Sequence, residues 1–172
     1  LIERAAPRLP KAALRLVLNL AERWDVTSRA RRELAIRAAA VGEVSVAVEL
    51  FAAAGAENDE EVVRLFGAVA VKDMLRLMEL SARLSPRVRA TGFGEMLGHA
   101  PAPIKQRLTR ELTELLLDWR QIGASERKRL WRRLGPSLAR MSHSRLLALY
   151  TRLLADAGAK GQQELFEEMC GF

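Results

Sequence analysis

The chain has 172 residues, of which 49% are hydrophobic and 28% charged, a composition that excludes a largely disordered protein and allows a substantial core. Aromatic residues make up only 5%, so leucine and alanine have to supply the packing, which favours helices over sheets. The single cysteine, Cys170, excludes a disulfide within the chain. We find no secretory signal and no apolar stretch long enough to predict a membrane span.

The net charge of +7 is concentrated in two segments. Residues 1–40 contain nine basic and four acidic side chains, and residues 119–140 contain seven basic and one acidic. The segment between them, 41–118, has more acids than bases. This distribution is typical of a docking surface for a polyanion, and the alternative is that the charges are solvated helix faces.

Apolar residues follow helical spacing along nearly the whole chain, and capping residues, glycines and prolines divide it at short intervals. No segment alternates apolar and polar residues long enough to predict a strand. We predict about ten helices. Their approximate limits are Pro10 to Trp24, Thr27 or Ser28 to Gly42, Ser45 to Ala54, Asn58 onward, Lys72 to Leu84, Pro86 to Gly98, Pro103 to Gly123, Ser125 to Gly135-Pro136, Ser142 to Gly158, and Gln162 to Met169.

These helices form a degenerate repeat. The first helices of successive pairs are centred about 28 to 37 residues apart, and so are the second helices. This spacing is typical of helix-pair solenoids. The sequence FGEMLG at 93–98 matches FEEMCG at 166–171 at four of six positions. We therefore expect an all-α protein, an α-solenoid of about five antiparallel helix pairs in one domain over 1–172, as a whole or as part of a longer chain. The alternative is an irregular helical bundle.

Four segments resemble known helical repeats. The sequence LAIRAAAVG at 34–42, followed by Ala47, Phe51 and Ala54, resembles the small-large packing pattern of tetratricopeptide and pentatricopeptide repeats. The sequence GQQELFEEM at 161–169 resembles the second helix of a pentatricopeptide unit. The sequences VKDMLRLMELSARL at 71–84 and SHSRLLALYTRLL at 142–154 resemble the heptatricopeptide-type repeats of organellar RNA-binding proteins. This resemblance covers about half the chain, lacks a RAP domain and lacks assignable base-reading positions. It implies a mitochondrial or plastid protein that acts in RNA metabolism or within an organellar ribosome.

The strongest local feature is the sequence SERKRLWRRL at 125–134. On a helix, Leu130, Trp131 and Leu134 fall on one arc and four cations fall on another, so the helix can bury one side and present cations on the other. Cations grouped in this way can contact successive phosphates. The RNA-binding residues predicted here are Arg120, Lys128, Arg129, Arg132 and Arg133.

Two further arginine clusters occur in second helices of the predicted pairs. If these helices share one face of a solenoid, the clusters line a discontinuous basic track, and the alternative is a solvated face or a contact with an acidic protein. The residues concerned are Arg29, Arg31, Arg32 and Arg37 in the first pair, and Arg87 and Arg89 in the third.

No residue set suggests catalysis, so we expect no enzyme activity, cofactor, metal or small-molecule substrate. His99 and His143 are far apart and lack helical spacing to each other or to Cys170. The glycines Gly92, Gly94 and Gly98 follow no predicted strand, which argues against a nucleotide-binding loop. The three tryptophans, Trp24, Trp119 and Trp131, occupy apolar helical positions and are expected in the core rather than stacking on bases.

Two functions fit these features. The first is a non-catalytic protein that binds the RNA phosphate backbone without reading sequence, beside neighbouring protein subunits of a mitochondrial ribonucleoprotein such as the ribosome. The second is a protein-binding scaffold or adaptor that makes no nucleic-acid contact. The first requires basic clusters on a common surface, and the second requires an exposed apolar strip.

Overall fold

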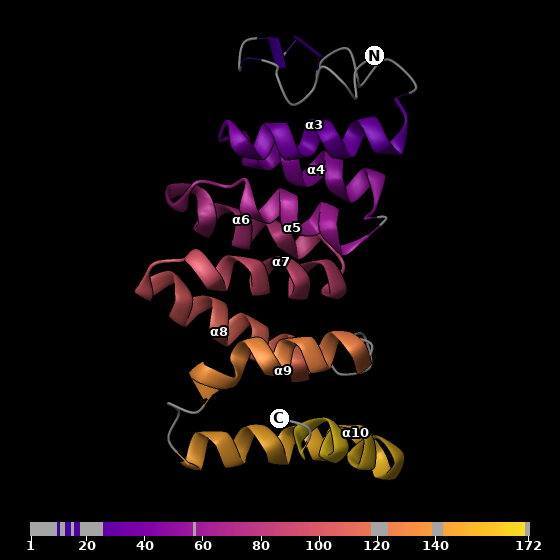
Figure 1. The fold of residues 1–172 in the computed structure, drawn as a ribbon, viewed down its shortest axis with the longest axis vertical. Helices are drawn as coiled ribbons and strands as arrows, with labels where there is room; N and C mark the ends of the chain where they lie inside the picture. Colours follow the sequence, from indigo (N-terminus) through magenta and orange to yellow (C-terminus); the bar gives the residue numbers. More distant parts are fainter. Residues whose placement is uncertain are drawn as a thin grey trace. The chain divides into compact units, whose positions relative to one another are not determined.

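A computed structural model describes residues 26–56, 58–117, 124–138 and 143–170, together with a few positions between 10 and 17. The described residues form helices and contain no strand, so the prediction of an all-helical protein is confirmed for this part of the chain (Figure 1). Most of the first predicted helix, 10–24, and the end of the seventh predicted helix, 118–123, lie outside the described residues. The α-helices are α3 (Ser28–Ala40), α4 (Val44–Ala54), α5 (Asp59–Gly67), α6 (Met74–Leu80), α7 (Pro86–His99), α8 (Ala102–Leu117), α9 (Ala124–Leu138) and α10 (His143–Cys170).

The predicted helix caps are present at α3 and α5. The Thr27 hydroxyl accepts a hydrogen bond from the Ala30 amide at 3.3 Å, and the Asn58 side chain accepts one from the Glu61 amide at 3.0 Å. These contacts satisfy amides that the first turn of a helix leaves unpaired. The predicted stops at Gly42 and Gly55 are also confirmed, since both glycines have positive φ angles of 85° and 70°.

The predicted helix over 72–84 is shorter than expected, because 3₁₀ turns flank α6. These are η2 (Val71–Asp73) and η3 (Ser81–Arg83). The buried Ser81 hydroxyl donates to the Met78 carbonyl at 2.7 Å, and this side-chain bond competes with a continuing α-helical backbone. Pro86 follows shortly afterwards and disfavours helical geometry in the residue before it.

Two predicted stops in the C-terminal part of the chain are wrong. Helix α9 continues through Gly135-Pro136 to Leu138, although a proline at this position has no N–H to donate to the preceding turn. Helix α10 continues through Gly158, where we predicted separate ninth and tenth helices. The alternating alanines at 155, 157 and 159 favour the helix, and a glycine costs only about 1 kcal/mol relative to alanine.

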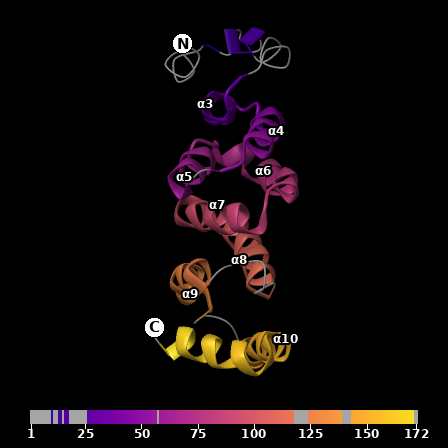
Figure 2. The ribbon, with the colours of Figure 1, turned by 90° about the vertical axis from the view of Figure 1, so that its right-hand side faces the viewer.

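Contacts within the chain divide it into two compact units, residues 1–96 and 97–172. In the first unit α3 packs along α4, α5 contacts α3, and α6 contacts α4. Figure 2 shows α3, α5 and α7 on one side of this unit and α4 and α6 on the other. In the second unit α8, α9 and α10 contact one another.

The core of the first unit is built around three phenylalanines, Phe51, Phe66 and Phe93, each no more than 1% exposed. The rings of Phe66 on α5 and Phe93 on α7 meet edge to face, with centroids 6.0 Å apart. Gly92 lies beside them, and a Cβ atom added there would overlap the Phe66 ring. Gly92 therefore allows α5 and α7 to approach closely.

Replacement of Gly92 by alanine tests this close approach. Because Phe66 is fully buried and cannot swing away, we expect Gly92→Ala to lower the free energy of unfolding by about 1–3 kcal/mol. Gly98→Ala in the same helix is the matched control, since nothing lies within 4 Å of its added Cβ. The control is expected to leave stability unchanged or raise it by up to about 1 kcal/mol. Equal denaturation midpoints for the two variants would contradict the account.

Candidate nucleic-acid interface

Helix α9 separates its apolar and basic residues as predicted. Leu130, Trp131 and Leu134 are at most 4% exposed, and Trp131 packs against Tyr150 of α10 with ring centroids 6.1 Å apart. The prediction that Trp131 is a core residue is confirmed, whereas Trp24 and Trp119 lie outside the described residues.

The cations of α9 lie on its other side. Lys128, Arg129 and Arg132 are exposed and Arg133 is half-buried. We call these four residues the α9 basic face. Arg129 and Arg133 also interact within the chain, so Lys128 and Arg132 give the cleaner probe of an external partner. The predicted Arg120 lies outside the described residues.

Sequence reasoning missed Arg127, which is buried at 4% exposure and interacts within the chain. Its position, four residues before Trp131 and seven before Leu134, places it on the apolar arc of the helix. That spacing was the available signal, but a run of basic residues obscured it. Arg127 is thus a structural residue and not part of the α9 basic face.

The α3 cluster is divided between the surface and the interior of the first unit. Arg29 is exposed, Arg31 and Arg37 are half-buried, and Arg32 is buried at 7% exposure. Both Arg29 and Arg37 interact within the chain. The predicted clusters on α3 and α7 belong to the first unit and the α9 basic face to the second, so their convergence on one surface stays a prediction.

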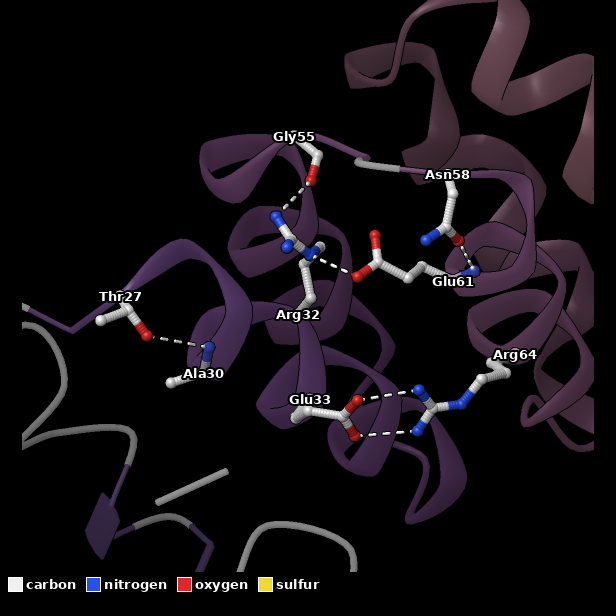
Figure 3. Close-up of polar contacts among 8 residues, drawn as sticks. All are labelled: Thr27, Ala30, Arg32, Glu33, Gly55, Asn58, Glu61 and Arg64. Carbon is white, nitrogen blue, oxygen red and sulfur yellow. Dashed lines mark hydrogen bonds and ion pairs between the residues drawn. The ribbon is translucent and has the colours of Figure 1, made fainter. Parts of the chain in front are cut away.

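Arg32 points inward, which argues against its predicted role as an RNA-binding residue. Its Nε donates to Glu61 Oε1 of α5 at 2.7 Å, and its Nη1 donates to the Gly55 carbonyl at 3.5 Å (Figure 3). The two paired side chains are only 8% and 15% exposed. A guanidinium committed to a buried carboxylate in this way is not available to a phosphate.

A second pair joins the same two helices nearer the surface. Both Nη atoms of Arg64 on α5 donate to the carboxylate of Glu33 on α3, each at 2.8 Å (Figure 3). The hydrogen bond from Arg64 lowers the pKa of Glu33 against the opposing effect of burial, and neighbouring positive charges lower it further. The cleft between α3 and α5 is therefore lined by both signs of charge, at Arg29, Glu33, Asn58, Glu60, Glu61 and Arg64. With three glutamates and two arginines in its lining, this cleft does not favour a polyanion.

The two predicted residues of α7 differ from each other. Arg87 is exposed, and its Nη2 donates to Asp59 Oδ1 of α5 at 3.3 Å. Arg89 is half-buried, and its Nε is buried without a hydrogen-bond partner among the described residues. Arg87 is thus paired with an acid and Arg89 is partly buried. Of the three predicted clusters, on α3, α7 and α9, the one on α9 is the most accessible to solvent.

Comparison of the chain with protein-family models, with curated proteins and with solved structures finds no match. Among the described residues, no three histidine, cysteine, aspartate or glutamate side chains are grouped so as to hold a metal ion. No described helix has the length and apolar character needed to cross a membrane.

The Arg32–Glu61 pair provides a direct test of the inward role of Arg32. Arg32→Ala removes the guanidinium that pairs with the largely buried Glu61 carboxylate, and we expect the free energy of unfolding to fall by about 3 kcal/mol. Arg83→Ala is the control, because Arg83 and Glu49 form a pair in which both side chains are about 60% exposed. This control should cost less than about 1 kcal/mol. Similar losses in the two variants, measured by chemical denaturation, would refute a structural role for Arg32.

The Glu33–Arg64 pair predicts a pH dependence of stability. Because the pKa of Glu33 is lower in the folded chain than its ordinary value of 4.5, the folded state binds fewer protons and the pair stabilises the fold above that pH. This contribution is lost as the pH falls through the lowered pKa. At neutral pH, we expect the denaturation midpoint of the wild type to be higher than that of Glu33→Gln. The difference between the two midpoints should shrink below pH 4.5. A difference independent of pH would contradict this role.

Proposed function

We propose that this chain is a non-catalytic helical-repeat protein that binds RNA through the α9 basic face. The observation that carries the proposal is the division of one helix between a buried apolar side and an exposed basic side. Leu130, Trp131 and Leu134 anchor the helix, and this anchoring holds Lys128 and Arg132 one turn apart on the surface. Each phosphate neutralised by such a cation releases counterions, which gives affinity that falls with salt.

The architecture that we propose is an α-solenoid of stacked helix pairs. Contacts between side chains in the first unit support it, because they join residues separated by a nearly constant number of positions. These separations are 29 for Arg32 and Glu61, 31 for Glu33 and Arg64, 31 for Ser45 and Arg76, 34 for Glu49 and Arg83, and 28 for Asp59 and Arg87. A helix that always pairs with the helix one repeat further along produces this regularity.

The cellular setting included in the proposal is an organellar ribonucleoprotein, such as the mitochondrial ribosome, in which neighbouring subunits also contact the chain. It rests on the resemblance of residues 71–84 and 142–154 to the heptatricopeptide-type repeats of organellar RNA-binding proteins. The uneven charge supports it, since a chain whose basic residues gather in two segments has a localised surface for a polyanion.

A protein-binding scaffold is the second candidate, and exposed apolar side chains favour it. Leu147 and Leu154 on α10 are 67% and 36% exposed, and they lie two turns apart on one side of the helix. Val71 and Leu75 in the first unit are 50% and 41% exposed. Capture of protein partners that survives nuclease treatment would favour the scaffold, whereas partners lost with the RNA would favour the first function.

Charge reversal on α9 tests the RNA-binding proposal. We expect Lys128→Glu with Arg132→Glu to weaken binding to a fluorescently labelled RNA by about tenfold or more, and to make the slope of log affinity against log salt shallower by about 2. The control is Lys105→Glu with Arg110→Glu, which makes the same change in net charge at exposed positions of α8. Equal weakening by both variants would show a general charge effect and overturn the proposal, as would undiminished binding by the α9 variant.

A further inference from the structure

The side chains of α9 restrict the kind of RNA that its basic face can bind. Helix α9, residues 124–138, contains one aromatic residue, Trp131, and neither Asn nor Gln. Trp131 is 4% exposed and packs against Tyr150, so its ring is not available for stacking on a base. The α9 basic face therefore presents cations without an aromatic platform and without an amide suited to reading adenine.

These properties match poorly with single-stranded RNA. Proteins that bind single strands without sequence preference combine a basic groove with aromatic rings, and each stacked base contributes about 1–3 kcal/mol. The α9 basic face offers no aromatic ring for that stacking, so it relies mainly on electrostatic attraction, with the arginine guanidinium groups as its only flat surfaces. Electrostatic attraction alone is greater toward a double helix, because two strands place more phosphates within reach of the same cations.

The spacing of the cations suits phosphate contacts. Lys128 and Arg132 are separated by four residues, as are Arg129 and Arg133, so each pair spans about 6 Å along the helix axis. The two pairs form adjacent rows about 100° apart around the helix. Because Arg129 and Arg133 also interact within the chain, only Lys128 and Arg132 are counted here, and these two cations can neutralise about two phosphates.

We propose that the partner of the α9 basic face is double-helical RNA, held through its phosphates without base reading. This inference rests on the proposed RNA-binding function. In an A-form duplex the major groove is too narrow for side chains to read, and the phosphates and 2′-hydroxyls remain accessible. A helix that carries cations and no exposed ring fits such a surface by charge and shape.

The test compares three probes by fluorescence anisotropy with the full chain. They are an unstructured single-stranded RNA, an A·U-rich duplex and a G·C-rich duplex, all of one length. We expect the duplexes to bind at least about threefold more tightly than the single strand, with affinities within about twofold of each other and a salt slope near −2. Tighter binding of the single strand, or a strong dependence on base composition, would overturn the inference while leaving RNA binding intact.

Two variants separate this inference from the proposed function. Trp131→Phe keeps a buried ring, and circular dichroism would report whether the variant folds. The folded variant should keep the same preference for duplex RNA over single-stranded RNA. Selective loss of single-strand binding in this variant would reveal a stacking role and contradict the inference. Lys128→Glu with Arg132→Glu should lose duplex binding by about tenfold or more. Failure of wild type to bind any of the three probes would instead refute the proposed function.

Discussion

The helices of the first unit are too short to be stable alone. Helices α4, α5 and α6 contain 11, 9 and 7 residues, whereas isolated helices below about 12–15 residues are marginal in water. They are held by neighbouring helices: α4 packs along α3 and also contacts α6, and α5 contacts α3 and places the Phe66 ring against Gly92 of α7. The geometry of this unit depends on that side-by-side packing.

The same packing determines which charges remain for a partner. Between α3, α5 and α7, acids and bases from successive helices pair with each other, as Arg32 does with Glu61 and Arg87 does with Asp59. The paired arginines contribute to joining the helices, and their charge is offset by the acids of α5. On α9, by contrast, the apolar residues anchor the helix and Lys128 and Arg132 extend from its exposed side. A basic cluster in the sequence thus corresponds to different roles in the two units.

Much of the helical structure was predictable because its signals are local. The caps at Thr27 and Asn58 and the stops at Gly42 and Gly55 are determined by residues within one turn. The continuation of α10 through Gly158 was not predicted, because the cost of one glycine is small beside the helical preference of the surrounding alanines. The 3₁₀ turn after α6 depends on a buried hydroxyl, whose burial the sequence does not reveal.

The candidate site was predictable only where one helix contains all of it. The two sides of α9 follow from the positions of Leu130, Trp131 and Leu134 on a single helical wheel. The inward role of Arg32 depends on Glu61, which is 29 residues away and on another helix. Likewise, the role of Gly92 depends on a ring from α5. Periodicity identifies the apolar side of a helix, but it does not identify the neighbour that covers it.

Arginine footprinting is the most direct test of the claim that α9, rather than α3, meets the RNA. The chain would be treated with phenylglyoxal with and without a saturating RNA, and modification at each arginine would be quantified by mass spectrometry. We expect RNA to protect Arg132 strongly and to leave Arg31 and Arg37 modified to the same extent. Protection of the α3 arginines with no change at Arg132 would contradict the account.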